Sequence, residues 1–405
     1  MQANVVIVGG GHAGGMTAIF LRQINYSGSI IVIGEEEFLP YQRPSLSKGF
    51  LSAEIEEKRL YLKSDNFYKK NNISMICNTH VKDILKDQKK IILDDGKVIN
   101  FDNLVLCTGS IVKKIDYPEL ESNILYLRDI KDSLKIRDII KNNKKIAIIG
   151  AGYIGLEIAS IIRKNKINTT IIELENRLMK RVASKELASY FEARHRDEGV
   201  QFKLQTSIGS MYKKGQKINI ECSDNSIISS DIVIAGIGVL PNVTLAVNMG
   251  LKCNNGIVVD EFCQTSHKNI FAAGDCTNHH NHIFKKNVKL ESVHNAVEQA
   301  KTVAYMINGE QKPYNQVPWF WSDQYDIKLQ IAGLIDDNNE KIIRGSLKED
   351  KFSVFLLKNG RLLAVESVNS PKDFIIGRKL IGSQCIITRE QIEDVNFDLK
   401  DLINK

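Results

Sequence analysis

The sequence predicts an α/β protein with two repeated strand–turn–helix units, followed by a separate α+β domain. Three observations support this prediction. A glycine-rich segment at residue 9 is repeated at residue 150, an apolar run precedes each copy, and alternating strand patterns begin after Pro318. The chain has 405 residues, which is enough for two or three domains of about 150 residues each.

The first unit starts at the apolar run 5–8. This run reads Val-Val-Ile-Val, and an unbroken apolar run is typical of a strand buried on both faces of a parallel sheet. Glycines follow at Gly9, Gly11 and Gly14, and apolar residues then recur at helical spacing over 18–24. A second apolar strand over 30–33 leads to Glu35. The order predicts a strand, a tight turn, a helix and a second strand.

The second unit repeats this order. The apolar run 146–149 precedes Gly150, Gly152 and Gly155, helical spacing continues over 156–162, and the strand 170–172 leads to Glu173. The repeat extends further, because the apolar run 104–107 before Thr108 and Gly109 has a counterpart at 232–235 before a second glycine pair. Two similar nucleotide-binding domains are therefore expected.

The rest of the chain supplies the remaining elements. A buried strand over 269–273 leads to Asp275, helical spacing runs over 291–306, and a strand over 352–357 precedes the hairpin signal Asn359-Gly360. We expect residues 1–112 and 245–317 to form one discontinuous domain. Residues 113–244 should form the second nucleotide-binding domain, and residues 318–405 a C-terminal α+β domain.

The composition is that of an ordinary globular protein. Apolar residues make up 43% and charged residues 25%, and 55 Lys and Arg against 48 Asp and Glu give a net charge of +7. This excess favours a solvated Lys-rich surface over an acidic partner. Because no basic run with interleaved aromatic residues occurs, nucleic-acid binding is not expected.

The cysteines indicate a reducing compartment. Seven are scattered along the chain and none forms a Cys-x-x-Cys pair, which argues against a disulfide framework, a zinc site or a dithiol redox centre. No run reaches the roughly 18 apolar residues that a membrane span needs, and the first apolar run is too short for a signal peptide. A cytoplasmic protein without membrane insertion is expected.

The glycine motifs indicate phosphate chemistry. The spacing G-x-G-x-x-G lets the backbone approach a pyrophosphate, whose charge meets the N–H groups of the following helix, while the later acid accepts from ribose hydroxyls. A single copy can be a plain tight turn, but two copies in the same context favour nucleotide binding. Glu173 would repel a 2′-phosphate, which favours NAD over NADP. Arg177 and Arg181 lie further on and would allow some binding of NADP, although ordinary surface arginines are the simpler interpretation.

Two dinucleotides in one chain suggest two electron carriers. A flavin held permanently in one domain can be reduced by a nicotinamide cofactor that visits the other. The sequence thus predicts an oxidoreductase flavoprotein with FAD and NADH as cofactors.

Several further motifs extend this prediction. They are Pro-Tyr-Gln-Arg-Pro-Ser-Leu-Ser-Lys at 40–48, Gly-Tyr-Ile-Gly-Leu-Glu at 152–157, Phe-Glu-Ala-Arg-His at 191–195 and Pro-Trp-Phe-Trp-Ser-Asp-Gln at 318–324. With them the chain resembles, from end to end, the single-component FAD ferredoxin reductases of the putidaredoxin reductase and biphenyl dioxygenase type. The resemblance implies a glutathione-reductase-like arrangement of two Rossmann-like domains with a C-terminal α+β domain.

The resemblance also implies which residues bind the cofactors. Those expected at FAD are Gly9, Gly11, Ala13, Gly14, Glu35, Arg43, Pro44, Lys48, Val81, Thr108, Gly109, Arg128, Asp275 and Val293. Those expected at NAD are Gly150, Gly152, Tyr153, Ile154, Gly155, Glu157, Glu173, Ile237 and Gly238.

Four residues are the candidates for chemistry. On the resemblance, Lys48 and Glu157 position the nicotinamide and tune the flavin, whereas a lone Lys and a helical Glu are ordinarily solvated. Trp319 and Trp321 are the two tryptophans of the chain, and in a strand their rings point to one face. They either anchor the C-terminal domain or flank the flavin where an electron acceptor docks.

Two expected absences complete the prediction. No Cys lies in 44–48, where similar disulfide reductases carry redox cysteines, and Cys107 is expected to be a small buried hydrophobe. Histidines 279, 280 and 282 are expected in a solvated loop, so no metal is predicted.

The function predicted on the resemblance is NADH-dependent ferredoxin reduction. Hydride passes from NADH to FAD, and single electrons then go to a 2Fe-2S ferredoxin that serves a cytochrome P450 monooxygenase or a ring-hydroxylating dioxygenase. The alternatives are a rubredoxin reductase and a non-catalytic FAD/NAD-binding protein of the apoptosis-inducing-factor type. A monomer and a homodimer are both open.

Overall fold

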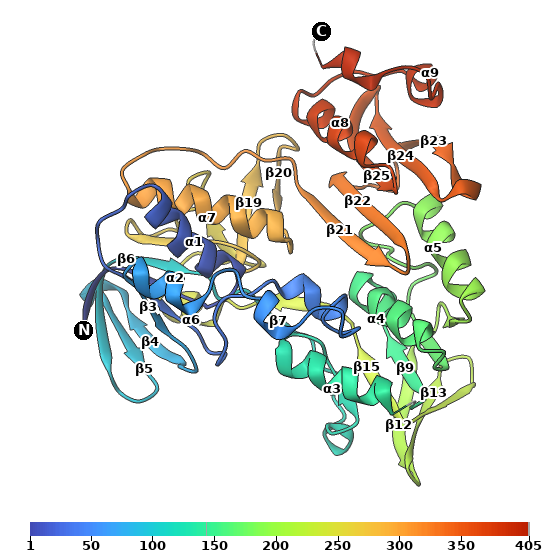
Figure 1. Cartoon of the computed structure of the whole chain (residues 1–405), viewed down its shortest axis with the longest axis horizontal. Coiled ribbons are helices and arrows are strands. Elements are labelled where there is room, and N and C mark those ends of the chain that lie inside the picture. The colour runs from blue at the N-terminus through green and yellow to red at the C-terminus, as the bar shows by residue number, and fades with distance from the viewer. Residues whose placement is uncertain (143, 404–405) are drawn as a thin grey trace. The chain divides into compact units, whose positions relative to one another are not determined.

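The computed structural model describes residues 1–142 and 144–403 (Figure 1). The chain forms two compact units. Unit 1 comprises Met1–Arg43, Glu57–Ile111 and Val239–Pro318, and unit 2 comprises Pro44–Glu56, Val112–Gly238 and Trp319–Lys405.

Unit 1 is built on a sheet with the strand order β3-β2-β1-β6-β5-β4, in which β18 also pairs with β6. The parallel strands are β1 (Gln2–Val8), β2 (Ile30–Ile33), β3 (Ile73–Ile76), β6 (Val98–Leu106) and β18 (Ile270–Ala272). Strands β4 (Val81–Leu85) and β5 (Lys90–Leu93) add an antiparallel edge. The predicted apolar run is buried at every position from Val5 to Val8, as a strand covered on both faces requires.

Two helices of unit 1 pack against each other, α1 (His12–Gln23) and α7 (Val293–Ile307) (Figure 1). The shorter helices are α2 (Asp65–Lys70) and α6 (Thr244–Asn248). Strands β17 (Ile257–Val259), β19 (Thr277–Asn281) and β20 (Lys286–Val288) form a small sheet, and β7 (Ser110–Val112) pairs with β16 (Val239–Pro241). His279 and His280 therefore lie on strand β19, so their predicted placement in a loop was wrong.

Unit 2 repeats the parallel arrangement. Its five-stranded sheet has the order β11-β10-β9-β15-β8, so that β9 lies between two parallel neighbours as β1 does in unit 1. The strands are β8 (Ile124–Leu125), β9 (Ile146–Ile149), β10 (Thr169–Ile172), β11 (Gln201–Lys203) and β15 (Ile232–Ala235). An antiparallel sheet adds β12 (Ile208–Lys214), β13 (Lys217–Cys222) and β14 (Ile227–Ser230), and the helices are α3 (Ile130–Lys141), α4 (Tyr153–Lys164) and α5 (Lys185–Asp197).

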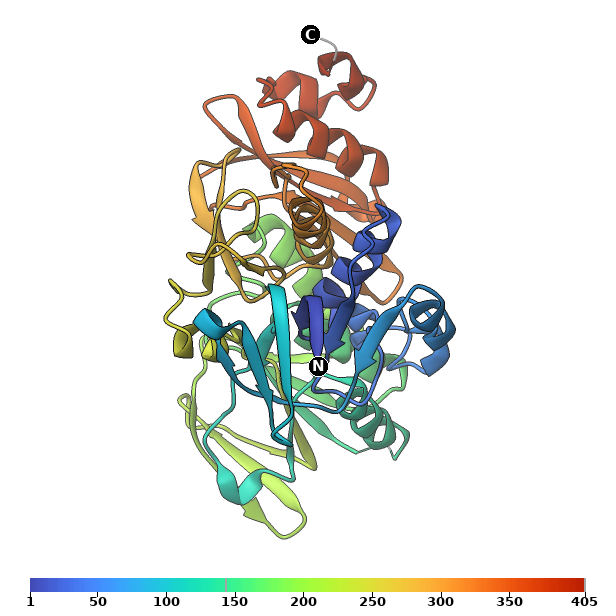
Figure 2. The same ribbon diagram turned by 90° about the vertical axis from the view of Figure 1, so that its left-hand side faces the viewer.

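The C-terminal part of unit 2 is an antiparallel sheet with the order β21-β22-β25-β24-β23. Its strands are β21 (Trp319–Gln324), β22 (Ile327–Gly333), β23 (Glu340–Ser346), β24 (Lys351–Lys358) and β25 (Arg361–Val368). Helix α8 (Pro371–Gly382) packs along β25 and β22 (Figure 2), and α9 (Arg389–Glu393) follows. Asn359 and Gly360 have φ of 53° and 73°, the left-handed backbone that the predicted hairpin turn requires.

One hydrophobic core joins the two halves of unit 2. It includes Ile148, Leu156 and Phe191 of the nucleotide-binding part together with Leu329 and Phe352 of the C-terminal sheet. The two parts of unit 2 therefore share buried apolar surface.

Segment 44–56 belongs to unit 2, whereas the predicted boundaries place it in the first domain. The Ser133 hydroxyl on α3 donates to the carbonyl of Leu46 at 2.8 Å. The Arg137 guanidinium lies 4.3 Å from the ring centroid of Phe50, and Leu51 lies in the shared core. Ser133 and Leu46 are 87 residues apart in the sequence. Because the partners are so distant, no local sequence pattern predicts these contacts.

Candidate functional site

The first glycine turn of unit 1 leaves an open space at one position only. Gly9 has φ +116°, and a Cβ there would lie 2.0 Å from the Cys107 carbonyl oxygen; a Cβ on Gly14 would lie 2.0 Å from the Gly9 oxygen. At Gly11 a Cβ would meet no described atom within 4 Å. Packing therefore excludes side chains at two glycines, and the third leaves the backbone accessible to a ligand.

Helix α1 starts at this turn with unsatisfied N–H groups. Its N-cap is Gly11, and within the described residues the cap has no side-chain hydrogen bond and the first turn no acidic residue. The free N–H groups and the positive end of the helix dipole suit a pyrophosphate. His12, the first residue of α1, is neutral near pH 7, because burial, and secondarily the Arg43 charge, lower its pKa to about 4.

Asp275 lies beside the start of α1. Gly274 has φ +90°, and a Cβ on it would lie 3.0 Å from the Cβ of Ala13, so the chain after β18 runs directly against the helix. The Gly274 N–H donates to Gln299 Oε1 at 2.8 Å, and the Ser110 hydroxyl donates to Asp275 Oδ2 at 3.2 Å. A carboxylate held at this place can accept hydroxyl groups from a ligand that occupies the glycine turn.

The other predicted FAD residues of unit 1 differ in their surroundings. Glu35 is exposed and lies 3.4 Å from the His80 ring nitrogen, whereas Val81 is buried in the core. The Thr108 hydroxyl donates to the Asn242 carbonyl at 2.6 Å, and Asn242 N–H donates to the Gly109 carbonyl at 2.9 Å. Val293 is the first residue of α7.

Arg43 has protein partners that the sequence did not suggest. Its guanidinium pairs with Glu36 at 2.6 Å and lies 4.9 Å from the Tyr41 ring centroid. Because Glu36 and Tyr41 belong to the same loop, these contacts fix the direction of Arg43.

The glycine turn of unit 2 has the same geometry as that of unit 1. Gly150 has φ +100°, and a Cβ there would lie 2.5 Å from the Gly236 oxygen; a Cβ on Gly155 would lie 2.3 Å from the Gly150 oxygen. At Gly152, the N-cap of α4, a Cβ would meet no described atom within 4 Å. The sequence repeat is thus also a structural repeat with the same open position.

Glu173 is held against this turn. Its Oε2 accepts from the Ala151 N–H at 2.6 Å and its Oε1 from the Glu175 N–H at 2.9 Å. The two bonds fix the carboxylate at the end of β10, where the remaining lone pairs suit ribose hydroxyls and its charge opposes a phosphate.

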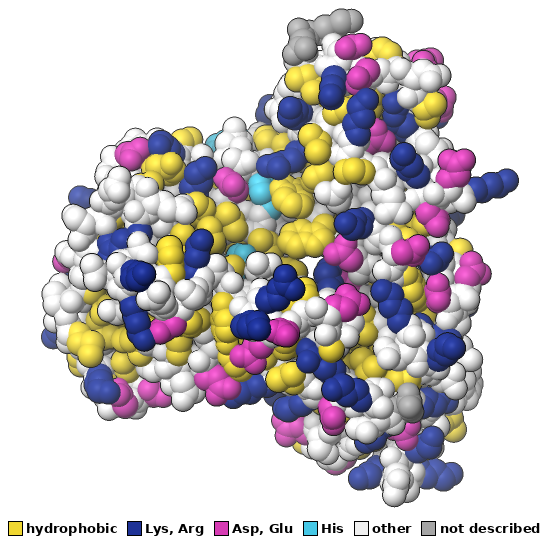
Figure 3. Space-filling view, in the orientation of Figure 1, with side chains coloured by type: hydrophobic (Ala, Val, Ile, Leu, Met, Phe, Trp, Pro, Cys, Tyr) yellow, Lys and Arg dark blue, Asp and Glu magenta, His cyan; other side chains and the backbone are white. Residues whose placement is uncertain are grey.

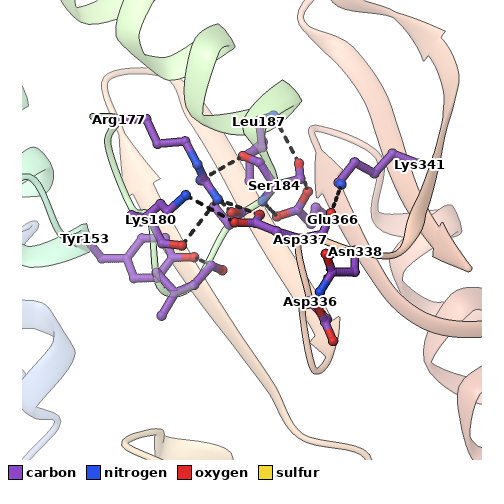
Figure 4. A network of polar contacts seen from close by, with 12 residues as sticks. Tyr153, Arg177, Lys180, Ser184, Leu187, Asp336, Asp337, Asn338, Lys341 and Glu366 are labelled. Carbon is purple, nitrogen blue, oxygen red and sulfur yellow. Dashed lines mark hydrogen bonds and ion pairs between the residues drawn. The ribbon is translucent and has the colours of Figure 1, made fainter. Parts of the chain in front are cut away.

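Arg177 is buried, so the simpler interpretation as a surface arginine was wrong for this residue. Its guanidinium donates to the carbonyl of Ala183 at 2.7 Å and pairs with Asp337 at 2.7 Å (Figure 4). Arg177 is 9% exposed and is directed to the C-terminal part of unit 2. Arg181 is exposed and remains the arginine that could approach a 2′-phosphate.

Lys48 and Glu157 form a buried ion pair in unit 2. Lys48 Nζ lies 2.7 Å from Glu157 Oε2, although the carboxylate side chain is only 4% and the ammonium side chain 15% exposed. The hydroxyls of Ser47 and Ser322 donate to the two carboxylate oxygens at 2.5 and 2.6 Å. Ser47 and Ser322 were missed as site residues, although both lie within motifs noted in the sequence. A buried charge with a cation and two hydroxyl donors is satisfied.

The other predicted NAD residues of unit 2 differ in their surroundings. Tyr153 donates to the Val182 carbonyl at 3.0 Å and packs edge-on against Phe320, with ring centroids 4.7 Å apart. Ile154 is 45% exposed at the start of α4. The predicted pair Ile237 and Gly238 follows β15, where Gly238 has φ +101°.

The two remaining predicted FAD residues, Arg128 and Pro44, also lie in unit 2. The Arg128 N–H donates to Asp132 Oδ2 at 2.9 Å, at the start of α3. Pro44 follows Arg43 in a short 3₁₀ helix over Arg43–Ser47.

Trp319 and Trp321 lie on one face of β21, with ring centroids 5.7 Å apart. Trp319 also packs edge-on against Phe374 at 5.4 Å, and the Arg378 guanidinium lies 5.8 Å from its ring centroid. Trp319 therefore anchors β21 to α8, which leaves Trp321, half-buried, as the tryptophan with fewer contacts to the C-terminal helix.

Four further observations concern the surface, metal sites, membrane spans and Cys107. Lys and Arg side chains are interspersed with Asp and Glu on the face in Figure 3. Among the described residues, no group of His, Cys, Asp and Glu has the arrangement of a metal site. None of the helices within the described ranges has the length and hydropathy of a membrane span. Cys107 is buried, and burial raises the pKa of its thiol well above the ordinary value.

Comparison with known proteins agrees with this geometry. Residues 3–300 match the family model described as pyridine nucleotide-disulphide oxidoreductase, and residues 319–403 match the model described as reductase C-terminal. Rhodocoxin reductase of Rhodococcus erythropolis is 37% identical over 98% of this chain and 93% of its own length. Putidaredoxin reductase CamA of Pseudomonas putida is 36% identical over 99% of this chain and 96% of its own.

A solved structure supports the same relationship. The crystal structure of the covalent putidaredoxin reductase–putidaredoxin complex contains a chain that superposes with a TM-score of 0.95 at 35% identity. The match covers 99% of this chain and 98% of that one.

Proposed function

The chain belongs to the pyridine nucleotide-disulphide oxidoreductase family, and from this membership we propose that it is an NADH-dependent ferredoxin reductase. It is an oxidoreductase whose cofactors are FAD and NADH. Electrons from NADH go through FAD to a 2Fe-2S ferredoxin, which serves a cytochrome P450 monooxygenase or a ring-hydroxylating dioxygenase. We place this electron transfer in the cytoplasm, since scattered thiols are typical of a reducing compartment.

The duplicated nucleotide site is the observation that supports this function best. Each unit has a glycine turn with one open position, at Gly11 and at Gly152, directly before a helix without a side-chain cap in the described residues. Two such sites can hold two dinucleotides at once, as transfer between a resident and a visiting cofactor requires.

The residues of unit 1 fit FAD. The N–H groups at the start of α1 would bind the pyrophosphate, and Asp275 would accept from the ribityl hydroxyls. When bound, FAD supplies the conversion of one hydride into two single electrons. The N–H groups and the positive dipole end at the start of α7, at Val293, would stabilise negative charge on the flavin ring.

The residues of unit 2 fit NADH. The N–H groups at the start of α4 would bind the pyrophosphate, and Glu173 would accept from the adenosine ribose. Glu157, fixed by Lys48 and two serine hydroxyls, would orient the nicotinamide. In this role Glu157 positions the nicotinamide. A fixed carboxylate can hold the reacting carbon in place without transferring a proton.

Steady-state turnover tests the proposed function. NADH oxidation is measured with a 2Fe-2S ferredoxin, with a rubredoxin and with ferricyanide, at matched concentrations. We expect NADH-dependent reduction of ferricyanide and of the ferredoxin. Faster turnover with rubredoxin than with the ferredoxin would identify rubredoxin as the acceptor. DNA binding without any turnover would support the non-catalytic alternative.

Asp275→Ala is expected to lose FAD. The substitution removes the acceptor beside α1 while leaving the glycine turn and the Gly274–Gln299 bond intact. The measurement is the ratio of flavin absorbance to protein after extensive dialysis, with Asp260→Ala, an exposed residue of unit 1, as the control. Full occupancy in Asp275→Ala would show that this carboxylate does not hold the ribityl chain.

NADH is expected to be preferred over NADPH by at least about tenfold in kcat/KM, equivalent to ~1.4 kcal/mol. Glu173 causes this preference through its contact with the 2′-hydroxyl and its repulsion of a 2′-phosphate. Glu173→Ala should narrow the gap, whereas Glu175→Ala, exposed and two residues on, should not. Equal kcat/KM for the two cofactors in the unaltered enzyme would refute this assignment.

A further inference from the structure

Strand β21 presents alternating side chains to two helices of unit 2. Ser322 and Gln324 are two residues apart and so lie on one face of the strand. The Ser322 oxygen lies 2.6 Å from Glu157 Oε1 on α4, and Gln324 Oε1 lies 2.8 Å from His195 Nε2 on α5. Gln324 Nε2 lies 3.1 Å from the Ser322 oxygen. A continuous line of hydrogen bonds therefore connects α5 to Glu157.

This line is buried from Glu157 to His195. Ser322, Gln324 and His195 are 0% exposed, and Glu157 is 3% exposed. Its far end is Tyr325, whose hydroxyl lies 2.9 Å from His195 Nδ1 and whose ring lies 5.6 Å from the Arg194 guanidinium. Because water does not replace a missing partner in a buried line, each bond depends on the direction of its neighbours.

The carboxylate fixes the direction of every bond. An ionised Glu157 only accepts, so Ser322 must use its single proton on it. The Ser322 oxygen can then only accept from the Gln324 amide N–H, which turns the Gln324 carbonyl toward His195. His195 must donate from Nε2, and its Nδ1 accepts from Tyr325. Burial, the largest effect, lowers the pKa of His195 to about 4, so the ring is neutral with its proton on Nε2.

A flipped Gln324 amide would reverse the line. The Gln324 carbonyl would then take the Ser322 proton, and Glu157 would lose one of its hydroxyl donors. His195 prevents this arrangement as long as its proton stays on Nε2.

We propose that Ser322, Gln324 and His195 are positioning residues that hold the Glu157 carboxylate in the orientation in which it pairs with Lys48 and receives the nicotinamide. This proposal rests on the proposed function, since it assigns a structural cause to nicotinamide positioning. The three residues act through Glu157 and do not touch the cofactor themselves.

Gln324→Glu tests the direction of the line. Glutamate has the same length, but its carboxylate has no N–H and only accepts, so it draws the Ser322 proton away from Glu157. We expect anaerobic reduction of bound FAD by NADH to slow by about tenfold per FAD-loaded molecule. Gln324→Met has a similar length and only a weak sulfur acceptor. Ser322 then keeps donating to Glu157 but loses the N–H that holds it, so the rate should fall by about threefold, less than in Gln324→Glu.

A double-mutant cycle tests the route. If Gln324→Glu acts through the Ser322 hydroxyl, adding it to Ser322→Ala should cause little further loss. Additive losses would show that Gln324 influences the rate by another route and would overturn the proposal. Equal rates for Gln324→Glu and the unaltered enzyme, or a slower rate for Gln324→Met than for Gln324→Glu, would overturn it as well.

The protonation of His195 provides a readout apart from activity. In protein with ¹⁵N-labelled histidine and no NADH, we expect the unaltered ring to carry a proton on Nε2 only. Gln324→Glu should give protons on both nitrogens, because the new carboxylate stabilises the charged ring. The resonance is assigned by its loss in His195→Asn. A proton on Nδ1 alone in the unaltered protein would overturn the proposal.

The proposed function and the positioning role can be contradicted separately. If the unaltered enzyme does not reduce its FAD with NADH, the proposed function is wrong. If the unaltered enzyme does so and the Gln324 variants contradict the expected order, only the positioning role is wrong.

Discussion

Replacing Glu157 by alanine is expected to slow FAD reduction by NADH by about 10- to 100-fold, while the photochemically reduced enzyme still passes electrons to ferredoxin at a near-normal rate. The substitution removes the carboxylate that pairs with Lys48 at 2.7 Å. It also removes the acceptor for the Ser47 and Ser322 hydroxyls. Each factor of ten corresponds to 1.36 kcal/mol of lost transition-state stabilisation, a typical range for a positioning contact.

Stopped-flow measurement of both half-reactions, normalised to bound FAD, checks this result. The matched control is Glu192→Ala, which removes a helical glutamate of unit 2 that pairs with Arg196 at 2.7 Å. Trp321→Ala should show the opposite bias and slow electron transfer to ferredoxin more than FAD reduction. Equal slowing of both half-reactions by Glu157→Ala and by Trp321→Ala would contradict this division of roles.

In the unaltered protein, Glu366 is expected to lower the free energy of unfolding by about 2–3 kcal/mol as the pH rises from 5 to 8. Glu366→Gln is expected to remove this pH dependence. Glu366 on β25 is fully buried. Its carboxylate accepts from the Ser184 N–H at 2.8 Å and from the Ser184 hydroxyl, at the start of α5 (Figure 4). Burial is the largest of the effects that raise its pKa from 4.5 to about 7.

The direction of the effect follows from the raised pKa. The folded protein binds the Glu366 proton more tightly than the unfolded chain, so its contribution to stability is complete below pH 4.5. This contribution is lost as the pH rises toward the folded value of about 7. Nearby Arg177 partly opposes the shift, whereas Glu186 adds to it.

Denaturant unfolding of the unaltered protein and of Glu366→Gln across this pH range gives the measurement. The difference in unfolding free energy should change in favour of the Gln variant as the pH rises, whatever the offset at pH 5. Glu349→Gln, which alters an exposed glutamate of the same part of unit 2, serves as the control. A constant difference across the range would mean that Glu366 is ionised in the folded protein at pH 5.

The glycine turns were predictable from the sequence because their requirements are local. Only glycine fits at these positions. The backbone has a positive φ at Gly9 and Gly150, and a Cβ at Gly14 or Gly155 would collide with a backbone oxygen. The apolar runs that precede them have no polar position, because both faces of these strands are covered. A local conformational need leaves a local pattern, so the repeat alone indicated two nucleotide-binding units.

The direction of individual charged side chains could not be read in the same way. The sequence favoured an ordinary surface role for Arg177, but the structure pairs it with Asp337, 160 residues further on. The chain 44–56 followed the first unit in sequence, yet its contacts with α3 place it in unit 2. Such contacts are set by tertiary packing, which leaves no periodic pattern in the sequence.

The sequence by itself thus determined the two dinucleotide folds, the hairpin of the C-terminal sheet and, through its motifs, the family. Only the tertiary structure decided the environment of Glu157. Its hydroxyl donors Ser47 and Ser322 are 110 and 165 residues away, and the buried line behind Ser322 reaches His195 on another helix. The physical reason is that a buried carboxylate is stable only where several distant groups meet it at once, and that coincidence exists only in the folded chain.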